Sequence, residues 1–163
     1  MKKRLALLAV PALLTLCLAT PAHASADHRE DPYQVERFNE GLSPDMQIVM
    51  DYVQAQLGKP YVYAASGPRA FDCSGLTLAA YRQIGIRLPH SSFTQSRMGR
   101  HVARRDVQPG DLIFMRGGDP PADLGHVGIA VSATDMISAP QPGGSVHRVR
   151  IPSGVQEIRR YVG

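Results

Sequence analysis

The chain of 163 residues contains no tryptophan, and aromatic residues make up only 6% of it. Glycine and proline, with 15 and 13 residues, stay well below the compositions of collagen or of low-complexity disorder. Because 44% of the residues are hydrophobic and 20% are charged, disorder throughout the chain is excluded. The length suffices for one hydrophobic core and is too short for two domains of ordinary size.

The chain also lacks a large excess of charge. The formal net charge is +4, and most of this excess comes from the three basic residues at positions 2–4. No basic stripe with interleaved aromatic residues follows, so the sequence carries no nucleic-acid-binding signature. The residues from Leu42 onward are mildly basic and could attract an anionic polymer. Such an excess more often reflects arginine side chains that are simply solvated.

The N-terminus has the parts of a secretory signal peptide. A basic head precedes an apolar run over residues 5–19, which ends in the small-x-small sequence Ala22-His23-Ala24. We therefore predict a signal peptide over 1–24 that is cleaved after Ala24, with Ala26 as the other choice of cleavage position. The alternative, a retained membrane anchor, needs about 20 apolar residues, and the run is shorter. We expect a protein that is secreted or associated with the cell wall, with no membrane contact after cleavage.

Two segments are expected after the signal peptide. Residues 25–41 are polar and acidic and lack hydrophobic periodicity, so they are interpreted as a leader or linker. Residues 42–163 are predicted to form the globular domain.

Cysteine is scarce, and its placement is informative. The chain has two cysteines, Cys17 and Cys73, and cleavage of the signal peptide removes Cys17. No intramolecular disulfide is then possible. A single thiol outside the cell is either buried and inert or retained for its chemistry.

Helices are predicted in the first half of the domain and strands in the second. The first helix starts at the N-cap Ser43 and runs to about Leu57, with apolar residues at steps of three and four. A second helix covers 76–84, and a third starts at Ser91 or Ser92 and ends near Met98. Short β-like runs follow at 112–115, 126–131, 136–139, 146–151 and 158–162. This order predicts an α+β domain with an antiparallel sheet.

Cys73 lies at or just before the start of the second predicted helix. The helix dipole and the unpaired backbone N–H groups there favour a thiolate and could stabilise an oxyanion. Such a nucleophile needs a base, which is usually histidine. Candidate histidines of the mature chain are His28, His90, His101, His126 and His147.

His126 is the strongest candidate base. It opens a strand in which Val127, Ile129 and Val131 alternate with Gly128 and Ala130, so small residues share its face. This leaves room around the imidazole for a substrate and for a partner helix. The alternative is an ordinary surface histidine at a sheet edge.

Five segments in this order resemble the NlpC-type cell-wall cysteine peptidases. They are Gly58-Lys59-Pro60-Tyr61-Val62-Tyr63, Phe71-Asp72-Cys73-Ser74-Gly75-Leu76, Leu88-Pro89, Pro109-Gly110-Asp111-Leu112-Ile113-Phe114 and Gly125-His126-Val127-Gly128-Ile129. The resemblance implies a papain-like α+β fold and hydrolysis of amide bonds in peptidoglycan stem peptides, typically between D-γ-glutamyl and a diamino acid.

The resemblance also implies roles for individual residues. Cys73 corresponds to the nucleophile and His126 to the general base. Tyr61 corresponds to a tyrosine beside the nucleophile, and Asp72 and Ser74 flank the nucleophile in the substrate groove.

The chain departs from the family at the third catalytic position. Family members usually carry a polar residue there, most often histidine, and this chain has Ser138. If the loop before it centres on Ser132, positions 126 and 138 lie directly opposite each other, and the serine could orient the imidazole. A water, Gln141 or His147 could do so instead. A second departure is Tyr63-Ala64-Ala65-Ser66, where the family commonly has tryptophan and glycines.

Other function classes are kept as alternatives. One is a non-catalytic module that binds the cell wall, and another is a cysteine amidase or acyltransferase on the same fold. No cofactor and no metal are expected, because the histidines are scattered without the spacing of metal ligands. The expected partner is the peptidoglycan stem peptide, bound by a monomer.

Overall fold

The computed structural model describes residues 41–116 and 125–163. The predicted signal peptide (1–24) and all but the last residue of the predicted leader (25–41) lie outside the described residues. All described residues belong to the larger of two compact units, Asp31–Gly163. No helix among them has the length and hydrophobicity needed to cross a membrane.

The first described helix, α2 (Pro44–Gln54), begins where the sequence predicts. The Ser43 hydroxyl accepts a hydrogen bond from the Met46 amide at 3.4 Å, and a proline occupies the first helical position. The apolar face of α2 is buried in the core. The helix ends earlier than the predicted Leu57, and the turn that follows contains Gly58 in a left-handed conformation with φ of 80°.

The next two helices lie against each other. Helix α3 (Cys73–Arg82) begins at Cys73 itself, three residues earlier than predicted, and α4 (Ser92–Gln95) is a single turn, shorter than predicted. Buried Gln95 joins them, since its side-chain amide accepts from the Thr77 hydroxyl at 2.8 Å and donates to the Ser74 carbonyl at 3.1 Å. This link holds the chain after α3 close to the start of that helix.

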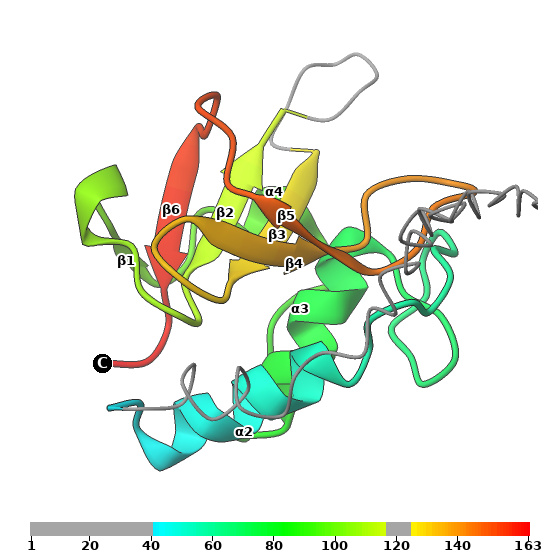
Figure 1. The fold of residues 1–163 in the computed structure, drawn as a ribbon, viewed down its shortest axis with the longest axis horizontal. Coiled ribbons are helices and arrows are strands. Elements are labelled where there is room, and N and C mark those ends of the chain that lie inside the picture. The colour runs from blue at the N-terminus through cyan, green and yellow to red at the C-terminus, as the bar shows by residue number, and fades with distance from the viewer. Residues whose placement is uncertain (1–40, 117–124) are drawn as a thin grey trace, which may run out of the picture. The chain divides into compact units, whose positions relative to one another are not determined.

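The strands form one antiparallel sheet, as predicted. The strands are β1 (Arg100–His101), β2 (Leu112–Met115), β3 (His126–Ala130), β4 (Asp135–Ser138), β5 (His147–Arg150) and β6 (Glu157–Arg160). Among the described residues they are ordered β1-β6-β2-β3-β4-β5 (Figure 1). The five strands from β2 to β6 were predicted within two residues at each end. Strand β1 and the short 3-10 helix η1 (Arg104–Asp106) were not predicted.

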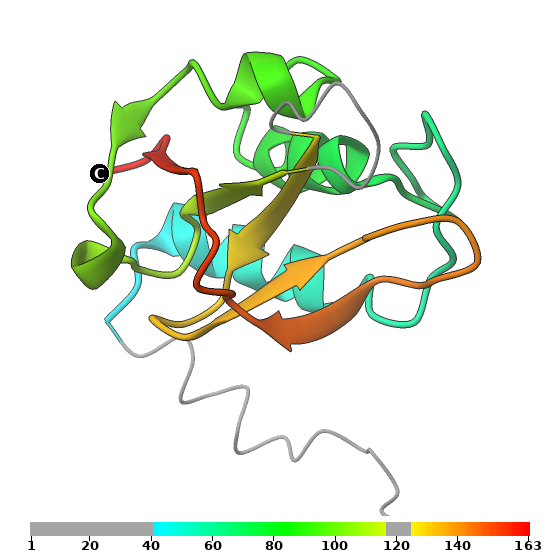
Figure 2. The same cartoon turned by 90° about the horizontal axis from the view of Figure 1, so that it is seen from above.

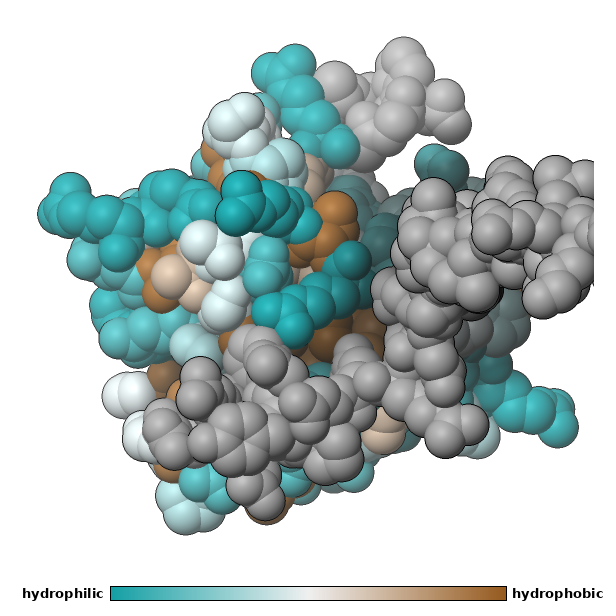
Figure 3. Space-filling model, in the orientation of Figure 1, coloured by the Kyte–Doolittle hydropathy of each residue, from teal (hydrophilic) through white to brown (hydrophobic). Residues whose placement is uncertain are grey.

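Helices pack on one face of the sheet, and a second apolar cluster covers the other. Helix α3 packs against β3, and α2 packs against α3 (Figures 1 and 2). Alternate residues of β3 enter the two clusters, with Val127 and Ile129 on the helix side and Ala130 on the other. The outermost strand β5 is exposed at all four positions, and hydrophilic side chains lie over it in Figure 3.

The register between β3 and β4 differs from the predicted one. Ile129 pairs with Ile137 and Ala130 with Met136, so the same register places Ser138 opposite Gly128 and not opposite His126. The predicted register was wrong because Ser132 does not lie at the centre of the turn. Its hydroxyl accepts hydrogen bonds from the amides of Thr134 and Asp135 at 3.1 and 3.0 Å, so it begins the turn.

A buried ion pair joins β6 to the start of β2. The Asp111 carboxylate is fully buried and accepts hydrogen bonds from Arg160 Nε at 2.6 Å and from Arg160 Nη2 at 2.7 Å. It also accepts from the Gln108 amide at 2.9 Å. Every partner of this carboxylate is a donor, so the negative charge is compensated inside the protein.

Replacing Asp111 with alanine should lower the free energy of unfolding by about 3–5 kcal/mol, because it leaves a guanidinium without its buried partner. Urea denaturation measures the effect. Asp106→Ala is the control, since Asp106 contacts Arg105 at 3.7 Å in an exposed pair and should cost less than about 1 kcal/mol. Equal losses in the two variants would contradict this assignment.

Candidate active site

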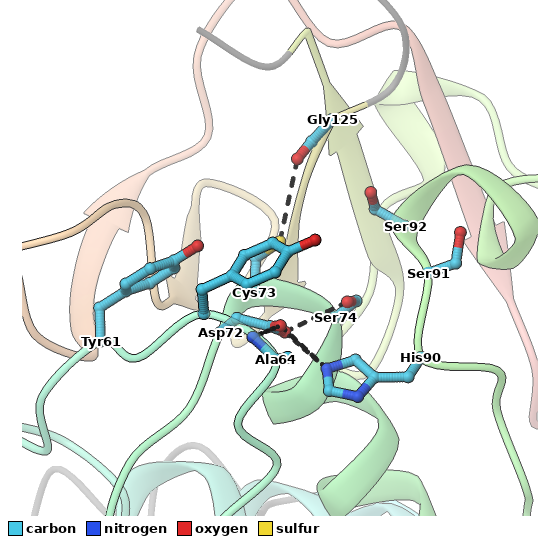
Figure 4. Close-up of a pocket in the computed structure, with 10 residues that line it drawn as sticks. Tyr61, Ala64, Asp72, Cys73, Ser74, His90, Ser91, Ser92 and Gly125 are labelled. Atoms are coloured by element: carbon cyan, nitrogen blue, oxygen red, sulfur yellow. Dashed lines mark hydrogen bonds and ion pairs between the residues drawn. The ribbon is translucent and has the colours of Figure 1, made fainter. Parts of the chain in front are cut away.

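Cys73 lies at the first position of α3 and faces the start of β3. Its sulfur is 3.9 Å from the carbonyl oxygen of Gly125 (Figure 4). A hydrogen bond with the backbone of Val127 also acts on the thiol. These two residues flank His126. The fold therefore brings the backbone of the predicted base to the predicted nucleophile. Among the described residues, no hydrogen bond joins the Cys73 thiol to the His126 imidazole.

Asp72, the N-cap of α3, binds three separate segments. One carboxylate oxygen accepts from the Gly75 amide at 2.6 Å and the Ser74 hydroxyl at 3.2 Å, and the other accepts from the Ala64 amide at 2.8 Å. His90 Nε2 lies 2.9 Å from both oxygens (Figure 4). Asp72 thus joins the helix start, the preceding loop and the segment before α4. It is buried, with 6% of its surface exposed, so its carboxylate is largely committed to these partners.

The sequence analysis gave His90 no role beyond that of a candidate base. The structure places it in the wall of the site, bound to Asp72. Its position depends on the chain reversal after α3 and on the anchoring of α4 by Gln95, so no spacing in the sequence links residues 72 and 90.

The loop before α3 lies directly over the first turn of the helix. Ala64 adopts a left-handed conformation with φ of 59°, which is unusual outside glycine, and its amide is held by Asp72. At Gly75 a Cβ atom would lie 2.1 Å from the carbonyl oxygen of Ala65, so glycine is required for this close approach. Pro60 and Tyr61 form isolated bridges, and a turn follows them.

A pocket of about 340 Å³ opens in front of Cys73. Figure 4 shows Tyr61 on one side of Cys73 and Ser91 and Ser92 on the other. Most of its lining is polar, and the lining residues are Tyr61, Tyr63, Ala64, Asp72, Cys73, Ser74, His90, Ser91, Ser92 and Gly125. The pocket therefore brings together four of the six predicted site residues. His126 and Ser138 lie behind it, on β3 and β4.

The pKa of the Cys73 thiol is raised above its ordinary value of 9.0, opposite to the predicted direction. Burial is the largest cause, and the negative charge of Asp72 acts in the same direction. Backbone hydrogen bonds from Val127, Ser74 and Cys73 lower the pKa but do not outweigh burial. The predicted position at the helix start is confirmed, but the prediction of a preformed thiolate was wrong. The carboxylate of Asp72, the N-cap residue, already interacts with the N-terminus of α3 and opposes a second negative charge there.

The pKa of His126 is lowered from 6.5 to about 4. Burial is the larger cause, and the charge of His147 is the second. The imidazole is therefore neutral at neutral pH and able to take a proton. Both shifts favour the uncharged forms, a neutral thiol at Cys73 and a neutral imidazole at His126.

Metal ligands do not gather in the described part of the chain. No group of three or more histidine, cysteine, aspartate or glutamate side chains lies close enough to hold an ion there. Cys73 is the candidate nucleophile of this site, and His126 is its candidate base.

Comparison with known sequences agrees with this chemistry. The NlpC/P60 family model matches residues 58–160. A Mycobacterium tuberculosis protein named "Probable endopeptidase" is 35% identical over 124 residues, which cover 75% of this chain and 31% of the relative. The Bacillus cereus "Gamma-D-glutamyl-L-lysine dipeptidyl-peptidase" is 35% identical over 111 residues, 65% of this chain and 33% of the relative. The chain thus spans about a third of the length of these curated relatives.

Solved structures show the same fold. A crystal structure of an NlpC/P60 family protein from Bacillus cereus has a TM-score of 0.67 and 31% identity, covering 75% of this chain and 42% of that one. RipD of Mycobacterium tuberculosis, described as a non-catalytic NlpC/p60 domain protein adapted to peptidoglycan binding, has a TM-score of 0.63 and 26% identity. The match covers 74% of this chain and all of RipD.

The raised pKa of Cys73 can be measured by alkylation. The rate of modification by iodoacetamide should keep rising past pH 9, because the thiolate forms late. Asp72→Asn should shift the profile to lower pH, since it removes a negative charge that opposes ionisation. Asp106→Asn, on η1, is the matched control and should leave the profile in place. A midpoint below pH 9 in the wild type would contradict the assigned protonation state.

Proposed function

Since the chain belongs to the NlpC/P60 family, we propose that it is a secreted cysteine endopeptidase that hydrolyses amide bonds in peptidoglycan stem peptides. The observation that carries the proposal is the placement of Cys73. It begins α3, lines a polar pocket, and contacts the backbone on both sides of His126. Cell-wall substrate implies action outside the cytoplasm, which agrees with the predicted signal peptide.

The reaction follows from the neutral resting pair. His126 takes the proton of the Cys73 thiol as the sulfur attacks the amide carbonyl carbon. The imidazolium then protonates the leaving amine as the C–N bond breaks, which leaves a thioester. Water, deprotonated by the same imidazole, attacks the thioester and releases the carboxylic acid and the thiol. Asp72 already binds the Gly75 amide, so the amides of Cys73 and Ser74, which hydrogen-bond to the thiol, are the N–H groups proposed to stabilise the oxyanion of each step.

The pocket suits a polar peptide. Tyr61, Ser74, Ser91 and Ser92, which carry hydroxyl groups, are among the residues that line it. We propose that Tyr61 and Ser74 contact the stem peptide directly. Asp72 acts in the groove chiefly by holding its walls in place, because its oxygens already have protein partners.

The bond proposed for cleavage is the one between D-γ-glutamyl and the diamino acid. The name of the Bacillus cereus relative, which is 35% identical to this chain, supports this choice. Tyr63 and Ala64, the first two residues of the turn 63–66, line the pocket, so the departure of this turn from the family pattern bears on which stem peptides fit.

A second candidate function is peptidoglycan binding without turnover. It is favoured by the raised pKa of Cys73, by the lack of a direct thiol–imidazole hydrogen bond in the described residues, and by the resemblance to RipD. In that case the same pocket would hold the stem peptide and Cys73 would remain unreacted.

Mass spectrometry of defined muropeptides after incubation with the purified protein separates these functions. We expect two product peptides whose masses sum to that of the substrate plus water, and no products with Cys73→Ala. Binding without products would favour the non-catalytic module. Products joined to a second amine would indicate an acyltransferase. Unchanged hydrolysis by Cys73→Ala would refute the proposal.

The two predicted partners of Cys73 should differ in importance. His126→Ala removes the base and should lower kcat by about 100-fold or more. Ser138→Ala should cost much less, because Ser138 lies opposite Gly128 and two residues from the position facing His126. Steady-state kinetics on a muropeptide gives both values. Equal losses would mean that the serine acts directly on the imidazole.

A further inference from the structure

We propose that His147, on strand β5, is the positioning residue for the imidazole of His126. It would take the part that the family usually gives to the third catalytic position, occupied here by Ser138. The proposal rests on the proposed function, because it concerns the base of that reaction.

Three adjacent strands place the two histidines on one face of the sheet. Ser138 pairs with His147 across β4 and β5, and the β3–β4 register places Gly128 opposite Ser138. Directly paired residues of an antiparallel sheet have their side chains on the same face. A Cβ atom on Gly128 would lie 3.2 Å from the Cβ of Ser138, which confirms that these two positions adjoin. His126 precedes Gly128 by two residues and therefore shares this face.

Small residues occupy the row between the two imidazoles. Gly128 has no side chain, and that of Ser138 is short and 99% buried. His147 is longer and exposed at the sheet edge, so it can extend over Ser138 and Gly128 toward His126. A histidine at position 138 would fill this space itself. The small serine at 138 thus leaves the space that the side chain of His147 would enter.

The hydrogen bonding of His147 leaves the required nitrogen free to accept. Its Nδ1 lies 2.8 Å from the carbonyl oxygen of Ser145, and a carbonyl can only accept, so Nδ1 carries the proton. In the neutral ring, Nε2 is then the acceptor. When His126 takes the thiol proton, its second N–H needs an acceptor that fixes the ring, and Nε2 of His147 can supply it.

Electrostatics couple the two rings as well. After burial, the charge of His147 is the cause that lowers the pKa of His126. Among the described residues, the other titratable groups near this end of β3 are Cys73 and Asp72 at the start of α3, Tyr61 in the preceding loop, and Arg116, which follows the residue paired with His126. Loss of the His147 charge should therefore raise the pKa of His126 from about 4 toward its ordinary 6.5.

Two substitutions separate positioning from charge. His147→Ala removes the acceptor and the charge, and should lower kcat by about 10- to 100-fold with little change in KM. His147→Gln keeps an acceptor oxygen without the charge and should retain most of kcat. In both variants the acidic limb of the kcat/KM profile should move to higher pH, because a base with a higher pKa becomes protonated sooner on acidification.

Rescue tests the link to position 138. In the His147→Ala background, Ser138→His should restore kcat, because it puts an imidazole directly into the row beside His126. His101→Ala is the matched control, since His101 is an exposed histidine on β1 that pairs with Glu157. It should change neither kcat nor the pH profile.

NMR titration of the His126 ring gives a readout that does not need hydrolysis. An upward shift of its pKa in His147→Gln supports the pairing of the two rings. An unchanged pKa together with unchanged kcat in His147→Ala overturns it, even if Cys73→Ala is inactive. If the wild type hydrolyses no muropeptide, the proposed function fails, and the titration still decides whether His147 acts on His126.

Discussion

The carboxylate of Asp72 is the interaction on which the site depends. It caps α3 through the Gly75 amide, holds Ala64 in its left-handed conformation, and binds His90 ahead of α4. Three chain segments that are distant in sequence thereby meet at one buried anion next to the nucleophile. The shape of the pocket in front of Cys73 is set by these hydrogen bonds more than by apolar packing.

The same carboxylate adds to the effect of burial on the pKa of Cys73. An anionic cap satisfies the helix end, and together with burial it opposes the formation of a second negative charge on Cys73. Burial also lowers the pKa of His126 to about 4, so its imidazole is neutral at neutral pH and can accept a proton. The proposed proton transfer from sulfur to nitrogen during attack agrees with both pKa directions, whereas a resting ion pair does not.

Sheet register decides how that base is supported. The turn that begins at Ser132 sets β4 so that Ser138 faces Gly128, and β5 then brings His147 into the same row. This register places Ser138 two residues from the position that faces His126. It also leaves a space of small residues that a side chain from the next strand can enter.

The sequence by itself determined the element types, the antiparallel strands and the placement of Cys73 at a helix start, because caps, turn residues and hydrophobic periodicity act over a few residues. It also indicated His126 through the small residues that share its face. Only the tertiary structure decided the β3–β4 register, the bond between His90 and Asp72, and the direction of the Cys73 pKa. These three features depend on residues that are distant in the sequence and meet only when the chain folds, and on the burial that results. The spacing of neighbouring residues therefore does not predict them.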